Sequence, residues 1–363
     1  MKPYILLTPG PTPLPPSVYA KLAEPILHHR TAEFRKLFDQ VIADMKHVYR
    51  TAGSVVMLTA SGTGAMESAI ANLLSPGDKS LVYTVGAFGD RFVKLHKAYG
   101  LEPVVLSEEW GRSADPDKLR AALKADPGLK AVFLQHCETS TGALNDVRTL
   151  ARVVREGSDA LVIVDAVSSL AGEECETDAW GLDVVLTASQ KGLMNGPGLS
   201  FAAVSERAWK AAEVARLPRF YFDWRKARAS LAGQETPFTP AVDLVAAQAE
   251  SLRLIKAEGI ENVWKRTAEL AAFTRKAVQE RLGLELLAPR PAHILTAARL
   301  PEGVDGTKLL AAVLAEERIA VADGQDKLKG RVLRIAHMGH ISLADVEAGV
   351  AALGRRLPAP SLR

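Results

Sequence analysis

The sequence predicts an α/β fold, with a mostly parallel, doubly wound sheet in a large domain and a smaller α/β domain after it. Short runs rich in Val, Ile and Leu alternate with longer helical patterns up to about residue 240. These runs are apolar on both faces, as strands covered by helices on both sides must be. Beyond this point the apolar runs become fewer, which indicates a second unit.

The expected elements follow in chain order. The strands of the large domain are expected at residues 55–60, 80–86, 103–107, 131–136, 161–166, 183–188 and 199–204. The helices between them are expected at residues 64–74, 90–100, 115–125 and 147–157. A long helix then starts near residue 241 and leads to small-domain strands at 293–300, 318–324 and 331–338. We expect an amino-terminal arm over 1–16, a large domain over 17–250 and a small domain over 251–363.

The composition excludes several classes of protein. The 45 Lys and Arg residues nearly balance the 42 Asp and Glu residues, and no run of like charges occurs, which argues against nucleic-acid and membrane-surface binding. No apolar stretch approaches the roughly 18 residues of a membrane span, and the amino-terminal apolar patch is too short for a signal-peptide core. Cys137 and Cys175 have neither a metal spacing nor a disulfide framework. We therefore expect a cytoplasmic protein without a metal site.

The stretch SGTGAMES at residues 61–68 follows the first expected strand. In doubly wound folds ligands collect at the carboxyl ends of the strands. Gly62 permits a tight turn, Ser61 and Thr63 offer hydroxyls, and a helix beginning near Ala65 points free N–H groups at an anion. The alternative is a plain strand-to-helix turn with a Ser/Thr cap. The stretch lacks the lysine of a P-loop and the full GxGxxG pattern.

Two further strand ends carry residues of interest. Phe88 lies between glycines in GAFGDRF, where an aromatic ring can lie flat on a planar group, although most aromatic side chains fill the core. Asp165 ends the most hydrophobic strand, so its carboxylate needs a cation or a raised pKa. The alternative for Asp165 is a helix cap.

Lys191 stands in LTASQKGLMNGPG, after another strand. A lysine in an apolar pocket has a lowered pKa and becomes a nucleophile that forms Schiff bases, although an isolated lysine here would more often be a surface residue. An anion cradle, an aromatic ring, a carboxylate and an amine, in that order, are the parts that pyridoxal 5'-phosphate needs. The sequence therefore favours this cofactor.

The chain resembles the class V (fold type I) aminotransferases, and within them the alanine–glyoxylate and serine–pyruvate enzymes. The resemblance runs from TPGPTPLPPSV to RVLRIAHMG, and its most specific markers are SGTGAMES, HCETSTG, VDAVSSLAG and SQKGLMNGPG in that order. It implies that Lys191 binds the cofactor covalently and moves the substrate proton, while Asp165 keeps the pyridine nitrogen protonated. The resemblance also implies that the cofactor phosphate is bound by Ser61, Gly62, Thr63 and Gln190. Phe88 would stack on the ring, at a position where relatives often carry Trp. Thr139 would contact the ring hydroxyl. His136 is a second candidate for ring contact or a structural histidine.

The resemblance also implies a homodimer with shared active sites. Thr236 matches a threonine that reaches the phosphate of the neighbouring subunit, and Thr239 is the fallback because two Thr-Pro steps make the register uncertain. A turn fixed by proline explains the same residues equally well. Arg334, within an apolar strand, would clamp the substrate carboxylate, the alternative being an internal salt bridge.

The activity implied is transfer of an amino group from alanine or serine to glyoxylate or pyruvate by a ping-pong mechanism. Aspartate is an alternative donor if Arg30 or Arg225 enters the pocket, and phosphoserine is another if His28, His29 and Arg30 bind its phosphate. A cysteine desulfurase needs a cysteine well after the lysine, whereas Cys175 precedes Lys191. A non-catalytic scaffold would be expected to lack Lys191 or Asp165.

Overall fold

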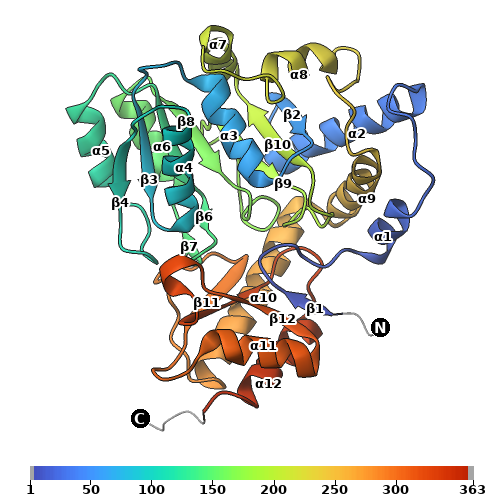
Figure 1. Cartoon of the computed structure of the whole chain (residues 1–363), viewed down its shortest axis with the longest axis vertical. Helices are drawn as coiled ribbons and strands as arrows, with labels where there is room; N and C mark the ends of the chain where they lie inside the picture. Colours follow the sequence, from blue (N-terminus) through green and yellow to red (C-terminus); the bar gives the residue numbers. More distant parts are fainter. Residues whose placement is uncertain (1–3, 359–363) are drawn as a thin grey trace.

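The computed structural model describes residues 4–358 and contains two main sheets (Figure 1). The larger sheet has the strand order β2 (Ser54–Leu58), β10 (Ser200–Val204), β9 (Val184–Ala188), β8 (Leu161–Asp165), β5 (Ala131–Gln135), β3 (Ser80–Thr84) and β4 (Val104–Ser107). β10 runs antiparallel to both of its neighbours, and the other pairs are parallel. The predicted fold class is therefore confirmed.

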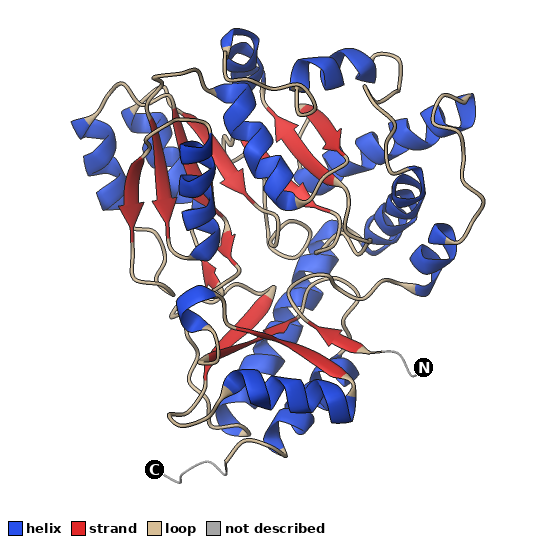
Figure 2. Cartoon of the chain, in the orientation of Figure 1, coloured by secondary structure: helices blue, strands red, loops and turns tan. Residues whose placement is uncertain are grey.

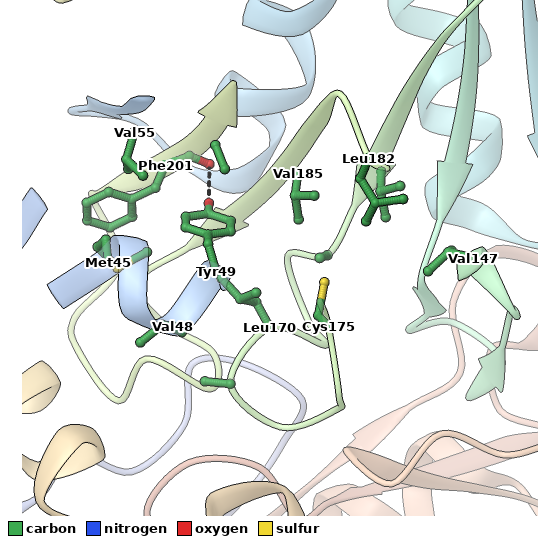
Figure 3. Packing of buried hydrophobic residues seen from close by; sticks show 14 of the residues in the cluster. Met45, Val48, Tyr49, Val55, Val147, Leu170, Cys175, Leu182, Val185 and Phe201 are labelled. Atoms are coloured by element: carbon green, nitrogen blue, oxygen red, sulfur yellow. Dashed lines mark hydrogen bonds between the residues drawn. The ribbon is translucent and has the colours of Figure 1, made fainter. Parts of the chain in front are cut away.

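Helices cover both faces of this sheet because successive strand residues point to opposite sides. One face packs against α2 (Ala32–Tyr49), α5 (Pro116–Ala125), α6 (Val147–Gly157) and α9 (Val242–Glu258). The other face packs against α3 (Gly62–Leu73), α4 (Ala87–Ala98), α7 (Glu206–Val214) and α8 (Trp224–Leu231). Figure 3 shows part of the first core, where the Tyr49 hydroxyl donates to the Phe201 carbonyl at 2.9 Å.

One strand departs from the expected burial. β4 lies at the edge of the sheet, and Val104 and Val105 are 40% and 46% exposed. The expectation that every strand is apolar on two covered faces is therefore wrong for β4, because helices do not cover an edge strand to the same extent.

The second sheet has the strand order β1 (Ile5–Leu7), β12 (Ile319–Asp323), β13 (Val332–Ala336) and β11 (Leu295–Arg299). Helices α10 (Ile260–Glu280), α11 (Gly306–Glu317) and α12 (Leu343–Gly354) pack on it, and η1 (Asp326–Leu328) precedes β13 (Figure 2). β1 comes from the amino-terminal arm and pairs parallel to β12. The arm thus leaves the second sheet before α1 (Pro16–Leu22) starts, and the predicted boundary at residues 250 and 251 falls within α9.

A short hairpin connects the two sheets close to the strand ends. It consists of β6 (Cys137–Glu138) and β7 (Ala143–Leu144), directly after β5. Arg334 of β13 donates to the carbonyl of Thr139 in this hairpin at 3.0 Å. The carboxyl ends of β5, β8 and β9 therefore face residues of the second sheet, and the candidate site lies there.

Candidate active site

Lys191 lies in the turn after β9, beneath the amino-terminal arm. Its amine donates to the carbonyl of Pro9, its own carbonyl accepts from the Thr12 hydroxyl at 2.9 Å, and a Cβ on Gly10 would lie 2.6 Å from its side-chain carbons. Burial, followed by the Arg334 guanidinium, lowers the pKa of Lys191 to about 8. The lysine is therefore held in a site that favours a neutral, nucleophilic amine.

Asp165 is the last residue of β8, and Leu186 of β9 is its strand partner. The carboxyl group is 4% exposed and accepts a hydrogen bond from Val167 N at 2.8 Å. Burial raises its pKa to about 6, and within residues 4–358 no basic side chain forms an ion pair with it. Asp165 is followed by turns and not by a helix, so the helix-cap alternative is wrong.

The cradle at the start of α3 has unused hydrogen-bonding groups. Ser61 is the N-cap residue, yet its exposed hydroxyl makes no capping hydrogen bond, so the plain-cap alternative does not describe it. A Cβ on Gly62 would lie 2.8 Å from Val167 Cγ1, which brings the helix start against the loop that follows Asp165. Gln190 adds a buried side-chain oxygen without a partner. The Ser61 hydroxyl and the free N–H groups at the helix start can donate to a phosphate, whereas Gln190 can do so only through its amide nitrogen.

Phe88 lies in the first turn of α4 and not at a strand end as expected, because β3 already stops at Thr84. The Arg91 guanidinium carbon lies 4.6 Å from the centre of its ring, and Arg91 also donates to the Thr63 hydroxyl at 3.0 Å. Arg91 thereby joins the starts of α3 and α4. The Thr139 hydroxyl lies 2.6 Å from that of Ser168, also at the strand ends.

Arg334 is 6% exposed and binds carbonyl groups in this structure. Its guanidinium donates to Asp323 O at 2.9 and 2.6 Å and to Thr139 O at 3.0 Å. Among residues 4–358 no carboxylate lies within ion-pair distance of it, so the internal salt bridge is not observed. Burial lowers its pKa to about 10, and a buried cation paired only with carbonyls is suited to a bound carboxylate.

Except for His136, the other predicted residues lie apart from this site. His136 borders the site through its backbone N–H, which donates to Asp165 O at 2.9 Å, but the residue also lines a separate cleft with Trp180. Arg30 pairs with Glu235, and Arg225 pairs with Asp223 at 2.9 Å. The Thr236 hydroxyl donates to Phe238 O at 2.7 Å, whereas Thr239 is exposed and lies 3.5 Å from His29 Nε2. The rings of His28 and His29 are tilted by 35° to each other, with their centres 4.8 Å apart. The structure therefore brings none of these groups to Lys191.

Pyridoxal phosphate fits the donor set. An unused hydroxyl and a helix start suit its phosphate, a buried carboxylate without a cation suits its protonated ring nitrogen, and a buried amine suits its aldehyde. Lys191, Asp165, Ser61, Gly62 and Gln190 are the residues that would hold it, with Thr63, Phe88 and Thr139 beside them.

Sequence reasoning missed three parts of this site. Arg91 lies three positions after Phe88 in the same motif, and its charge acts on both Asp165 and Lys191. Glu138, in HCETSTG, is buried and accepts from the backbone of Phe88 and Gly89 at 3.1 Å, so it fixes the start of α4. The third is the carbonyl of Pro9, and only the contact of the arm with Lys191 reveals it.

The lowered pKa of Lys191 predicts how the rate of covalent binding of pyridoxal phosphate to the cofactor-free protein depends on pH. A protonated amine is not nucleophilic, so the rate of covalent capture should rise with pH and level off above about 8. Stopped-flow absorbance after mixing with pyridoxal phosphate at several pH values measures this. A rate that still rises toward pH 10.5, the ordinary lysine value, would show that the site does not perturb the amine.

A family model and curated relatives match most of the chain, although the names of the relatives state different activities. A family model described as aminotransferase class-V matches residues 6–345. The 42 kDa subunit of the soluble hydrogenase of Anabaena cylindrica is 41% identical over 353 residues, which are 96% of this chain and 92% of that protein. The serine–glyoxylate aminotransferase of Methylorubrum extorquens is 36% identical over 93% of this chain and 87% of that protein.

A solved structure matches over nearly its whole length. The subgroup IV aspartate aminotransferase from Thermus thermophilus superposes with a TM-score of 0.90 at 34% sequence identity, over 97% of this chain and 99% of that chain. Sequence and fold therefore agree across both sheets.

Proposed function

The chain belongs to the class V aminotransferase family, and we propose that it transfers the amino group of alanine or serine to glyoxylate or pyruvate. The reaction is ping-pong and uses pyridoxal 5'-phosphate. One observation carries the proposal: a buried amine, a buried carboxylate without a cation and a buried guanidinium without a carboxylate surround the same strand ends. The name of the Methylorubrum relative supports serine and glyoxylate.

The proposed roles follow from what each side chain contacts. When bound, the cofactor withdraws electrons from the Cα of the amino acid. Lys191, neutral above about pH 8, would take the Cα proton of the amino donor on its Nζ and pass it to the cofactor, and in the second half-reaction it would deliver a proton to the Cα of the new amino acid. Asp165 stabilises positive charge at the ring nitrogen, and Arg334 orients the substrate carboxylate. The arm at Pro9 and Gly10 covers the lysine and excludes water from it.

The proposal favours small donors because the cations first considered for a second carboxylate are occupied. Arg30 and Arg225 pair with Glu235 and Asp223. The pairing of Arg30 also weakens the phosphoserine alternative. Arg91 keeps aspartate as the second candidate, since it is a cation close enough to affect Asp165 and Lys191. The name of the Thermus structure supports that candidate.

The test is the visible absorbance spectrum of the purified protein before and after single additions of alanine, serine, aspartate, phosphoserine and cysteine. We expect a yellow protein that alanine or serine bleaches within seconds. Bleaching by aspartate alone would move the donor class to the second candidate. A protein that stays colourless after incubation with pyridoxal phosphate would overturn the proposal.

Replacement of Arg334 tests the carboxylate clamp. Arg334→Lys keeps the positive charge but loses the two parallel N–H donors of the guanidinium group. We therefore expect KM for the amino donor to rise about tenfold or more, with a smaller fall in kcat. Steady-state kinetics with alanine and serine measure both constants. Arg299→Lys, at an exposed position on neighbouring β11, is the matched control. An unchanged KM in Arg334→Lys would remove Arg334 from the substrate site.

We also propose a homodimer with shared active sites. The aromatic patch formed by Phe220, Tyr221 and Phe238 is unusually exposed, at 69% for Phe220 and 46% for Tyr221, and the ring centres of Tyr221 and Phe238 are 5.3 Å apart. This patch lies beside Thr236 and Thr239. Because the Thr236 hydroxyl is already bound within its own chain, Thr239 is the better candidate to reach the phosphate of the neighbouring subunit.

Hybrid dimers test this sharing. Lys191→Ala and Thr239→Val subunits should each be inactive at limiting cofactor, and mixing them should restore activity in the one site that combines both intact residues. Turnover after joint refolding measures the recovery, which should reach about a quarter of the wild-type value if subunits pair at random. Thr236→Val in place of Thr239→Val is the matched comparison. If Thr239→Val were fully active alone and mixing Lys191→Ala with Thr236→Val restored activity, Thr236 would be the residue that reaches the phosphate of the neighbouring subunit.

We propose a cytoplasmic location. Both cysteines are free and buried, which is compatible with a reducing compartment. No helix within residues 4–358 is both long and apolar enough to cross a membrane.

A further inference from the structure

A cavity of about 1020 Å³ lies outside the catalytic site. Its walls come from α6, which packs on the larger sheet, from α10, and from residues 172–181 and 290–293. Lys191, Asp165, Arg334 and the start of α3 do not line it. The proposed transamination therefore does not account for this cavity.

The cavity has an excess of unpaired positive charge. Arg148, Lys265 and Arg290 line it, and none of them has a carboxylate within 4.0 Å in the described part of the chain. Of the four acidic residues of the wall, Glu174 is exposed and makes no hydrogen bond or ion pair within residues 4–358, whereas the other three are bound. Asp178 accepts from the Thr51 hydroxyl and from Ala52 N at 2.6 and 2.8 Å. Asp146 caps α6 through Thr149 N at 3.0 Å, and Glu173 holds His293 Nδ1 at 3.0 Å. The cations are thus available to an anionic ligand.

Two indole rings lie among these cations. Trp180 and Trp264 line the cavity, whereas Trp209 and Trp224 are buried in the core. Beside Trp180, at 6.0 Å between ring centres, lies His136, which is 4% exposed and whose Nδ1 has no partner. Trp264 also has an unpartnered ring nitrogen, Nε1. A ligand or water molecule bound in the cavity would complete the hydrogen bonding of these two nitrogens.

We propose that this cavity binds a nucleotide, with its phosphates on Arg148, Lys265 and Arg290 and its base against the two indoles. Flat aromatic rings suit a heterocyclic base, and clustered guanidinium groups suit phosphate oxygens. The volume lies at the upper limit of the range for small-molecule sites, which is about 300–1,000 Å³. A bound nucleotide would connect α6 of the large sheet with α10, which packs on the second sheet.

The test uses the cofactor-loaded protein, so that the phosphate cradle of the catalytic site is already filled. ADP is titrated while tryptophan fluorescence is recorded, and isothermal calorimetry gives the affinity. We expect saturable quenching with Kd below about 1 mM. The double variant Arg148→Glu/Arg290→Glu should bind ADP about a hundredfold more weakly, because two attractive contacts become repulsive.

Control variants keep this test separate from the transaminase proposal. Lys276→Glu, on the same helix as Lys265 but outside the cavity, should bind ADP as the wild type does. All variants should keep the cofactor absorbance and the basal transamination rate. Three results would overturn the proposal: no saturable binding up to about 5 mM ADP, wild-type affinity in the double variant, or equal affinity for inorganic phosphate alone.

Discussion

Lys191→Ala is expected to abolish transamination while the protein remains folded. The substitution removes both the amine that binds the cofactor and the base that moves the substrate proton, so turnover should fall by at least about a thousandfold. The absorbance band of the covalently bound cofactor should disappear. Noncovalent binding should persist, because Ser61, Gly62 and Gln190 remain to contact the phosphate.

A small amine tests whether the missing group is the proton carrier. Ethylamine in solution fits the space that the lysine side chain leaves, and it should restore part of the turnover of Lys191→Ala in proportion to its concentration. Lys256→Ala, whose exposed amine binds Asp44 at 2.8 Å, is the control for loss of a lysine elsewhere. Unimpaired turnover of Lys191→Ala would place the covalent link on another residue.

The strands of the large sheet could be predicted because they depend on local patterns. Runs such as residues 161–166 and 183–188 are apolar on both faces, and the structure contains β8 and β9 there, each one residue shorter than predicted. β1 could not be predicted in this way. It has only three residues and forms because Ile319 to Val321 of β12 offer an edge, and that partner is more than 300 residues away in the chain.

Only those site residues that belong to motifs at strand ends could be predicted from the sequence. Asp165 and Lys191 follow strands, and a doubly wound sheet brings the ends of such strands together. Arg91 and the Pro9 carbonyl enter the site through the start of α4 and through the amino-terminal arm. These contacts depend on how separate elements pack, which periodicity does not encode. Phe88 was also predicted incorrectly, at a strand end. Helix α4 starts one turn earlier than predicted, at Ala87, so Phe88 lies in its first turn.

Asp165→Asn is expected to lower turnover by about a hundredfold or more while the covalent link to Lys191 still forms. The carboxylate is buried and has no basic partner within residues 4–358, so its charge is available to a protonated ring nitrogen. An amide has the same shape but no charge, and it no longer stabilises that proton. Single-turnover absorbance with serine separates the chemical step from binding.

Whereas Asp165→Asn should lower turnover, it should raise the free energy of unfolding of the cofactor-free protein at pH values above about 6. Burial raises the pKa of Asp165 from 3.8 to about 6, so the folded state binds this proton more tightly than the unfolded chain does. The free energy of unfolding therefore loses this contribution as the pH rises from about 4 through 6, and Asp165→Asn should remove the loss because it does not ionise. Thermal unfolding at several pH values measures the difference between wild type and variant.

The matched control is Asp44→Asn. Asp44 is a buried carboxylate on α2 that Lys256 binds, and its substitution should leave turnover intact. If Asp165→Asn kept wild-type turnover and the same pH dependence of unfolding, its carboxylate would be a structural group, and the positive charge of the ring would need another partner.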